Sequence, residues 1–227
     1  MMPETSSVEI TATSKDQEMI EAVESRHVEK VKQLLKQYYL KDDDPSPSSP
    51  CSLIPALFAC FPTPEMRKYA NNSMPSNHEI LRLLVTEGES LLDVDMQDQD
   101  GDTPLHYAVK AEDGDSIAVL LDAGAHTDKV NNRVYTPLLL ATSLGYVELV
   151  KILVDAGADA TIRRPNGFDA YDLACYLSSG KGGTGRLYRK IDESLQDCRQ
   201  RYAEVTKVLE EHIENKKSPI PRLQTSC

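Results

Sequence analysis

Apolar residues along the chain return at steps of three and four, the spacing that places side chains on one face of a helix. The clearest set is Leu105, Ala108, Ile117, Leu120 and Leu121. The same internal spacing occurs near the N-terminus, at Met19, Ala22, Val31, Leu34 and Leu35. Each set divides into two short groups, so the pattern predicts two helices in succession, packed through their apolar faces.

Part of this pattern repeats as a phrase. Thr103-Pro104-Leu105 returns 33 positions later as Thr136-Pro137-Leu138, and Ala108 returns as Ala141. Leu121-Asp122-Ala123-Gly124-Ala125 likewise returns as Val154-Asp155-Ala156-Gly157-Ala158. A fixed period of this length is the signature of a stacked repeat, in which each small unit contacts its neighbours.

Each residue of the phrase has a physical role. Thr103 can cap a helix with its hydroxyl, and Pro104 suits the first helical turn, where its missing N–H would be unpaired. Gly124 and Gly157 stand where a helix ends in a left-handed residue. The segment 98–108, with its T-P-L-H-x-A core, resembles the ankyrin repeat. The resemblance implies pairs of short helices joined by β-hairpin tips, and a buried His106 tied to its neighbouring threonine.

The period extends in both directions. Forward, Asp169 and Ala170 replace Thr and Pro in a degraded copy that ends near Ala174. Backward, the apolar residues 53–59 predict a first helix, and Ile80, Leu83 and Leu84 a second. We therefore predict an all-α ankyrin-repeat solenoid over residues 16–180, with about five helix-pair units, short β-hairpin tips and a long C-terminal capping helix. The units fall near 16–40, 52–95, 98–130, 131–163 and 164–180.

Composition narrows the class of protein. The chain has 227 residues, of which 40% are hydrophobic, enough for one solenoid of this size. The first thirty residues are charged throughout, and no run of about 18 apolar residues occurs. The five cysteines show no metal-like pairing. We expect a cytoplasmic or nuclear protein that does not enter a membrane and is monomeric alone, with disordered ends at 1–15 and 217–227.

The net charge of −11 argues against nucleic acid as a partner, because phosphates require Lys and Arg. It agrees with a basic protein partner, or with solubility alone. An acidic Pro/Ser-rich segment, 41–51, interrupts the first two units and predicts a mobile loop. Three hydroxyl residues in or after this segment precede proline and are candidates for phosphorylation, although a tolerated insertion is the simpler interpretation of the segment: Ser46, Ser49 and Thr63.

The segment 181–216 predicts a glycine hinge followed by a long helix. Its apolar residues step by three and four, at Tyr188, Ile191, Leu195, Cys198, Tyr202, Val205 and Leu209. Two arrangements fit this seam. The helix covers the open core of the last repeat, or its distal half, from Cys198 onward, projects and takes a partner helix.

Catalytic and metal-binding patterns are weak. The segment 181–185 resembles a deviant Walker A loop, but Arg186 and Leu187 stand where Lys and a hydroxyl residue are required. The aspartates around Gly101 fail the calcium-loop spacing, because Met96 and Tyr107 take the end positions. We therefore predict no enzyme activity, no cofactor and no metal site.

The function is then expected on the face formed by the tips and the first helices, where ankyrin-like stacks hold proteins. The positions that the repeat leaves free for binding are Gln99, Asp100, Asp102, Lys110, Asn132, Arg133, Tyr135, Ser143, Leu144, Asn166, Phe168 and Tyr176. Tyr135, Phe168 and Leu144 are large apolar groups suited to anchor an interface. We predict a noncatalytic adaptor, chaperone or masking inhibitor. The alternative is a regulatory subunit that acts through the loop 41–51 or the C-terminal helix.

Overall fold

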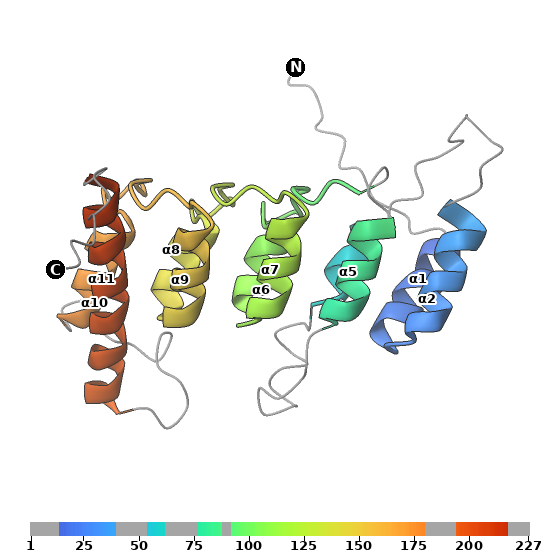
Figure 1. The fold of residues 1–227 in the computed structure, drawn as a ribbon, viewed down its shortest axis with the longest axis horizontal. Coiled ribbons are helices and arrows are strands. Elements are labelled where there is room, and N and C mark those ends of the chain that lie inside the picture. The colour runs from blue at the N-terminus through green and yellow to red at the C-terminus, as the bar shows by residue number, and fades with distance from the viewer. Residues whose placement is uncertain (1–13, 40–53, 62–76, 88–91, 180–193, 218–227) are drawn as a thin grey trace, which may run out of the picture. The chain divides into compact units, whose positions relative to one another are not determined.

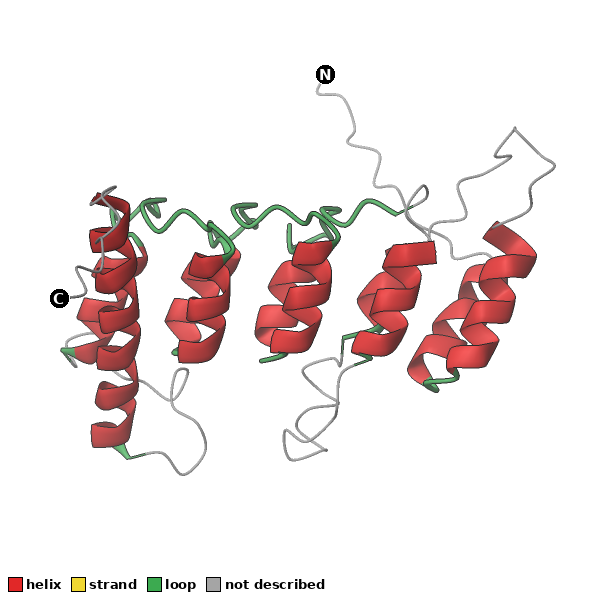
Figure 2. Ribbon diagram, in the orientation of Figure 1, coloured by secondary structure: helices red, strands yellow, loops and turns green. Residues whose placement is uncertain are grey.

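The computed structural model describes residues 14–39, 54–61, 77–87, 92–179 and 194–217. All regular structure within these residues is helical (Figure 2). The chain divides into two compact units, 1–93 and 94–227, and each is described by itself.

The first unit contains α1 (Ser14–Glu24), α2 (Val28–Leu34) with the π-helical turn η1 (Leu35–Tyr39), α3 (Ile54–Ala59) and α5 (His78–Glu87). Helix α1 packs on α2 and α3, and α2 packs on α5. The apolar set predicted from spacing forms this core, since Met19, Ala22, Val31, Leu34 and Leu35 are all buried. The side-chain amide of Asn77 donates to the carbonyl of Val23 at 3.0 Å and ties the end of α1 to the start of α5.

The second unit contains α6 (Pro104–Lys110), α7 (Gly114–Asp122), α8 (Pro137–Leu144), α9 (Val147–Asp155), α10 (Ala170–Ser178) and α11 (Leu195–Lys217) (Figure 1). Helices α6, α8 and α10 pack in series, and α7, α9 and α11 pack in a second series behind them. The two series are joined within each pair, so the unit is a two-layer stack of helix pairs.

The repeat phrase starts and ends its helices as predicted. The hydroxyl of Thr136 accepts the Leu139 N–H at 3.1 Å at the start of α8. Asp169 replaces threonine in α10 and does the same for Asp172 at 2.9 Å. Gly124 and Gly157 follow α7 and α9 with φ of 85° and 95°, the left-handed conformation that glycine adopts at low cost.

The tips between repeats are tight turns rather than β-hairpins. In the unit 131–163, for example, the Asn131 N–H donates to the Tyr135 carbonyl at 3.0 Å and the Val134 N–H to the Asn131 carbonyl at 2.9 Å. Two backbone hydrogen bonds reverse the chain but leave no length for strands. Carboxylates help to join successive tips: Asp128 accepts from the Asp159 N–H at 2.9 Å, as Asp95 does from the His126 N–H at 2.8 Å. The Asn132 N–H also donates to the Asp100 carbonyl of the preceding tip at 3.0 Å.

Helix α11 supplies the second helix that the predicted region 164–180 lacks. It packs on α10 and α9 in the place that α9 takes beside α8 and α7. Cys198, Tyr202, Val205 and Leu209 are buried to 0% exposure, so the seam faces the stack. The projecting arrangement from Cys198 onward is therefore wrong. Tyr188 and Ile191 lie outside the described residues, as does the predicted hinge.

The hydroxyl of Thr142 is a buried polar group without a hydrogen bond within the described structure. The residue is 0% exposed. One period earlier the place is taken by Val109, which is equally buried. Because an unpaired buried hydroxyl is costly, Thr142→Val is expected to raise the free energy of unfolding by about 1 kcal/mol. Urea denaturation measures this change.

Thr136→Val is the matched control for that substitution. It removes a hydroxyl that caps α8, and we expect it to lower the free energy of unfolding by about 1 kcal/mol. If Thr142→Val destabilised the protein as much as Thr136→Val does, the hydroxyl of Thr142 would have a partner after all.

Candidate functional site

His106 holds the tip of one repeat on the first helix of the repeat before it. Its Nδ1 accepts the Thr103 N–H at 3.2 Å, so Nε2 carries the proton and donates to the carbonyl of Tyr135 at 3.0 Å. Burial lowers the pKa of His106 below its ordinary value, which keeps the ring neutral. The prediction of a buried histidine tied to threonine is confirmed, and its second bond positions the backbone of Tyr135.

Asp102 is not a surface residue. It is 2% exposed, accepts from the side-chain amide of Asn131 at 2.8 Å and pairs with Lys110. The sequence analysis assigned it to the binding face because its position matches Tyr135 and Phe168 in later repeats. In this repeat the Asp102 carboxylate is bound by two donors, so it stabilises the repeat and is not open to a partner. Lys110 is half-buried by the same ion pair.

Two aromatic residues, Tyr135 and Phe168, stand at the same position of consecutive repeats. Each ring is half-buried against a neighbouring side chain. The guanidinium carbon of Arg164 lies 4.1 Å from the ring centroid of Tyr135. The ring of Phe168 lies 5.3 Å from that of Tyr176, which is 39% exposed. Each aromatic ring is thus held from one side and reaches solvent with the remainder, as anchor residues of interfaces do.

Polar side chains surround these rings. Arg163 donates to the Asp169 carboxylate at 2.9 Å and to the Gly167 carbonyl at 2.8 Å. The side-chain amide of Asn132 donates to the Gln99 carbonyl at 2.9 Å, which fixes adjacent tips to each other. We use the term tip face for the following predicted binding residues, which are exposed or half-buried: Gln99, Asp100, Asn132, Arg133, Tyr135, Asn166, Phe168 and Tyr176.

Ser143 and Leu144 do not belong to the tip face. Ser143 is 4% exposed, and its carbonyl accepts the Tyr202 hydroxyl at 2.7 Å. The Leu144 carbonyl accepts from Arg201 at 2.5 Å, and its side chain is half-buried. Helix α11 therefore docks on the C-terminal end of α8 and covers two residues that the sequence analysis left open for a partner.

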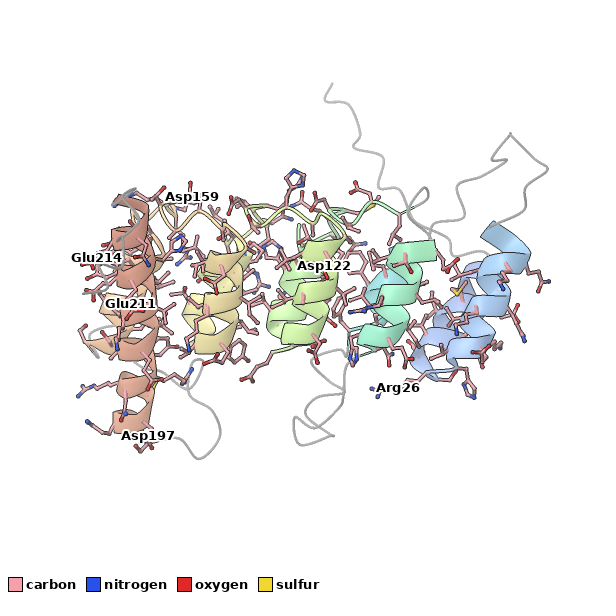
Figure 3. The ribbon with its side chains drawn as sticks, viewed as in Figure 1. Arg26, Asp122, Asp159, Asp197, Glu211 and Glu214 are labelled. Atoms are coloured by element: carbon pink, nitrogen blue, oxygen red, sulfur yellow. The ribbon has the colours of Figure 1, made fainter. Side chains whose placement is uncertain are left out.

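A cleft lies at the turn end of the helices, away from the tips. It has a volume of about 670 Å³ and is bounded by the turns after α6 and α8 and by the first half of α11. Val147 and Ile152 line it with apolar groups, and several acidic side chains surround them. Asp197, at the opposite end of the unit from Asp159 in Figure 3, is one of its lining residues. The repeat pattern does not predict this cleft, because it exists only where α11 docks on α9.

The remaining predicted residues contribute no further evidence for a functional site. Ser46, Ser49 and Thr63, the loop 41–51 and the glycine segment 181–185 lie outside the described residues. Asp98, Asp100 and Asp102 have carboxylate oxygens close to one another. Asp98, however, accepts the Asp100 and Asp102 N–H groups and the Tyr107 hydroxyl, at 2.9, 2.8 and 2.7 Å. The Asp98 carboxylate therefore stabilises the turn, and the proximity of the three carboxylates is not evidence for a metal site. Among the helices described, none has the length and apolar character needed to cross a membrane.

Comparison with known proteins agrees with the stack of helix pairs. A family model described as ankyrin repeats, in three copies, matches residues 69–176. Residues 69–176 therefore belong to the ankyrin-repeat family, and the resemblance seen in the sequence is confirmed. Ankyrin repeats are generally protein-interaction modules without catalytic activity.

Three curated proteins illustrate the similarity. Palmitoyltransferase AKR1 of Candida albicans is 32% identical over 95 residues, 42% of this chain and 12% of its own length. Ankyrin repeat and SAM domain-containing protein 6 of Rattus norvegicus is 35% identical over 99 residues, 43% of this chain and 11% of its own length. Inversin of Danio rerio is 43% identical over 65 residues, 29% of this chain and 6% of its own length. The chain thus spans about an eighth or less of these relatives.

Proposed function

We propose that this chain is a noncatalytic binding protein that holds or masks another protein through its tip face. The observation that carries the proposal is the pair Tyr135 and Phe168, which stand at the same position of consecutive repeats and are each supported by one neighbour. Rigid aromatic rings with a polar surround are the usual anchors of protein interfaces. The cytosol or nucleus is the compartment in which we place this activity.

The charges of the tip face indicate a partner of mixed charge. Asp100 is exposed at one repeat, whereas Arg133 is exposed at the next and Asn166, which is uncharged, at the one after. A uniformly basic partner would be attracted at one repeat and repelled at the next. The partner is therefore better described as a protein with apolar side chains for the rings and charges of both signs around them.

The alternative, a regulatory subunit acting through the C-terminal helix, would require the apolar seam of that helix to be exposed. The apolar seam from Cys198 to Leu209 is buried in the stack, so it offers nothing to a partner helix. The loop 41–51 lies outside the described residues and supplies no observation for that alternative.

Co-purification with the tagged full chain tests the proposal. A Tyr135→Ser/Phe168→Ser variant is expected to reduce recovery of the specific partner by about tenfold or more, because anchor residues each contribute on the order of 2 kcal/mol. Circular dichroism and urea denaturation establish that the variant remains folded.

Leu121→Ser is the matched control, because it removes another half-buried apolar side chain, one that belongs neither to the tip face nor to the cleft at the turn end. Full recovery with this control and loss with the double variant would support the tip face. Undiminished recovery with the folded double variant would refute it.

A further inference from the structure

We infer that the cleft between α7, α9 and α11 is a second docking site, and that its occupant is a segment of a partner protein that carries basic and aliphatic side chains together. This site is independent of the tip face, because its lining residues lie at the turn end of the helices.

The shape and floor suit side chains of a peptide. A volume of about 670 Å³ falls in the range of ligand pockets, which run from roughly 300 to 1,000 Å³. Val147 and Ile152 are half-buried and leave apolar surface facing the cleft. Gly114 keeps the space open on the α7 side, since a Cβ atom there would come within 3.2 Å of the Ile152 side chain.

The charge of the cleft selects the sign of the occupant. Four carboxylates line it, from Glu112, Glu148, Asp197 and Glu204, and the cation among its lining residues is Arg201. Glu148 already pairs with Lys151 at 2.9 Å, so the attraction comes mainly from the other three. Arg201 is engaged by the Leu144 carbonyl at 2.5 Å. Close to the cleft, Oδ2 of Asp113 is buried without a hydrogen bond in the described structure and adds a further negative charge. A Lys or Arg side chain entering the cleft therefore gains attraction from several directions.

Amphipathic Lys and Arg residues fit such a site in a second way. Their methylene stems cover apolar surface while the charged group stays near solvent. In this cleft the stem would lie on Ile152 and the charged group at Asp197 or Glu204. The acidic cleft at the turn end agrees with the net charge of −11, whereas the tip face carries charges of both signs.

Fluorescence anisotropy of the full chain with labelled peptides tests the inference. The probe is an octapeptide of alternating Lys and Leu, and an octapeptide of alternating Lys and Ser has the same charge without the aliphatic groups. We expect the Lys-Leu peptide to bind several times more tightly, because both the floor and the carboxylates contribute. Equal affinity for the two peptides, or no binding of the Lys-Leu peptide, would overturn the inference.

Two charge variants locate the binding. Asp197→Asn/Glu204→Gln is expected to weaken the Lys-Leu peptide by about fivefold to tenfold, in line with two partly exposed ion pairs. Glu211→Gln/Glu214→Gln removes the same charge from the part of α11 away from Asp197, as Figure 3 shows, and neither residue lines the cleft. This variant is expected to change the affinity by less than about twofold. Equal losses in both variants would mean attraction to an acidic protein in general, with no site.

Discussion

Tyr202→Ala is expected to lower the free energy of unfolding by about 4 kcal/mol, the cost of truncating a fully buried aromatic side chain. Tyr202 is 0% exposed and is the largest fully buried side chain described. Its hydroxyl also donates to the Ser143 carbonyl at 2.7 Å, so the truncation leaves that acceptor unpaired. Since folded domains have only about 5–15 kcal/mol of stability, this loss is a large share of the total, and α11 should open far more often than in the wild-type protein.

Urea denaturation measures the loss, and hydrogen exchange locates it. Amides of α11 should lose protection first, while those of α6 and α7 retain theirs. Tyr202→Phe is the matched control. It keeps the ring and removes one hydrogen bond, so we expect a loss of about 1 kcal/mol. A Tyr202→Ala variant within 1 kcal/mol of the wild-type protein would mean that α11 contributes little to the stack.

Gly145→Ala is expected to cost about 3 kcal/mol, because two penalties meet at this residue. Gly145 ends α8 with φ of 71°, a left-handed conformation that is unfavourable for alanine by about 1–2 kcal/mol. A Cβ atom there would also overlap Nη1 of Arg201, which donates to the Leu144 carbonyl. The methyl group therefore displaces the contact that holds α11 on α8.

Gly124→Ala separates the two penalties. Gly124 has φ of 85°, but no atom lies within 4 Å of the position of an added Cβ atom. Its replacement is expected to cost the backbone penalty alone. In an Arg201→Ala background the extra cost of Gly145→Ala should disappear, which a double-mutant cycle by urea denaturation would reveal. An extra cost that persists without Arg201 would contradict this account of α11 docking.

The repeat phrase predicted the fold because its chemistry is local. The cap at Thr136, the first-turn prolines and the glycine after α7 each act within a few residues of their own helix. The same is true of His106 and Thr103, whose contact was expected from the resemblance and is present. Such features can be derived wherever the determining partner is close in sequence.

The incorrect predictions of exposure concern residues whose covering side chains come from other parts of the chain. Asp102 matches Tyr135 by position, but Asn131 and Lys110 engage its carboxylate and bury it. Ser143 was left exposed by the period, whereas Tyr202, on the far side of the glycine segment, covers it. The cleft depends on the same docking of α11. An apolar seam predicts that a helix is covered, but it does not say by which surface.

The most direct test of the tip face is a hydrogen-exchange footprint of the full chain with the partner recovered by co-purification. The account predicts that amides around Tyr135 and Phe168 gain protection in the complex, at the tips of two consecutive repeats. Protection confined to the turns after α6 and α8 and to the start of α11 would contradict it, and would place the partner in the acidic cleft.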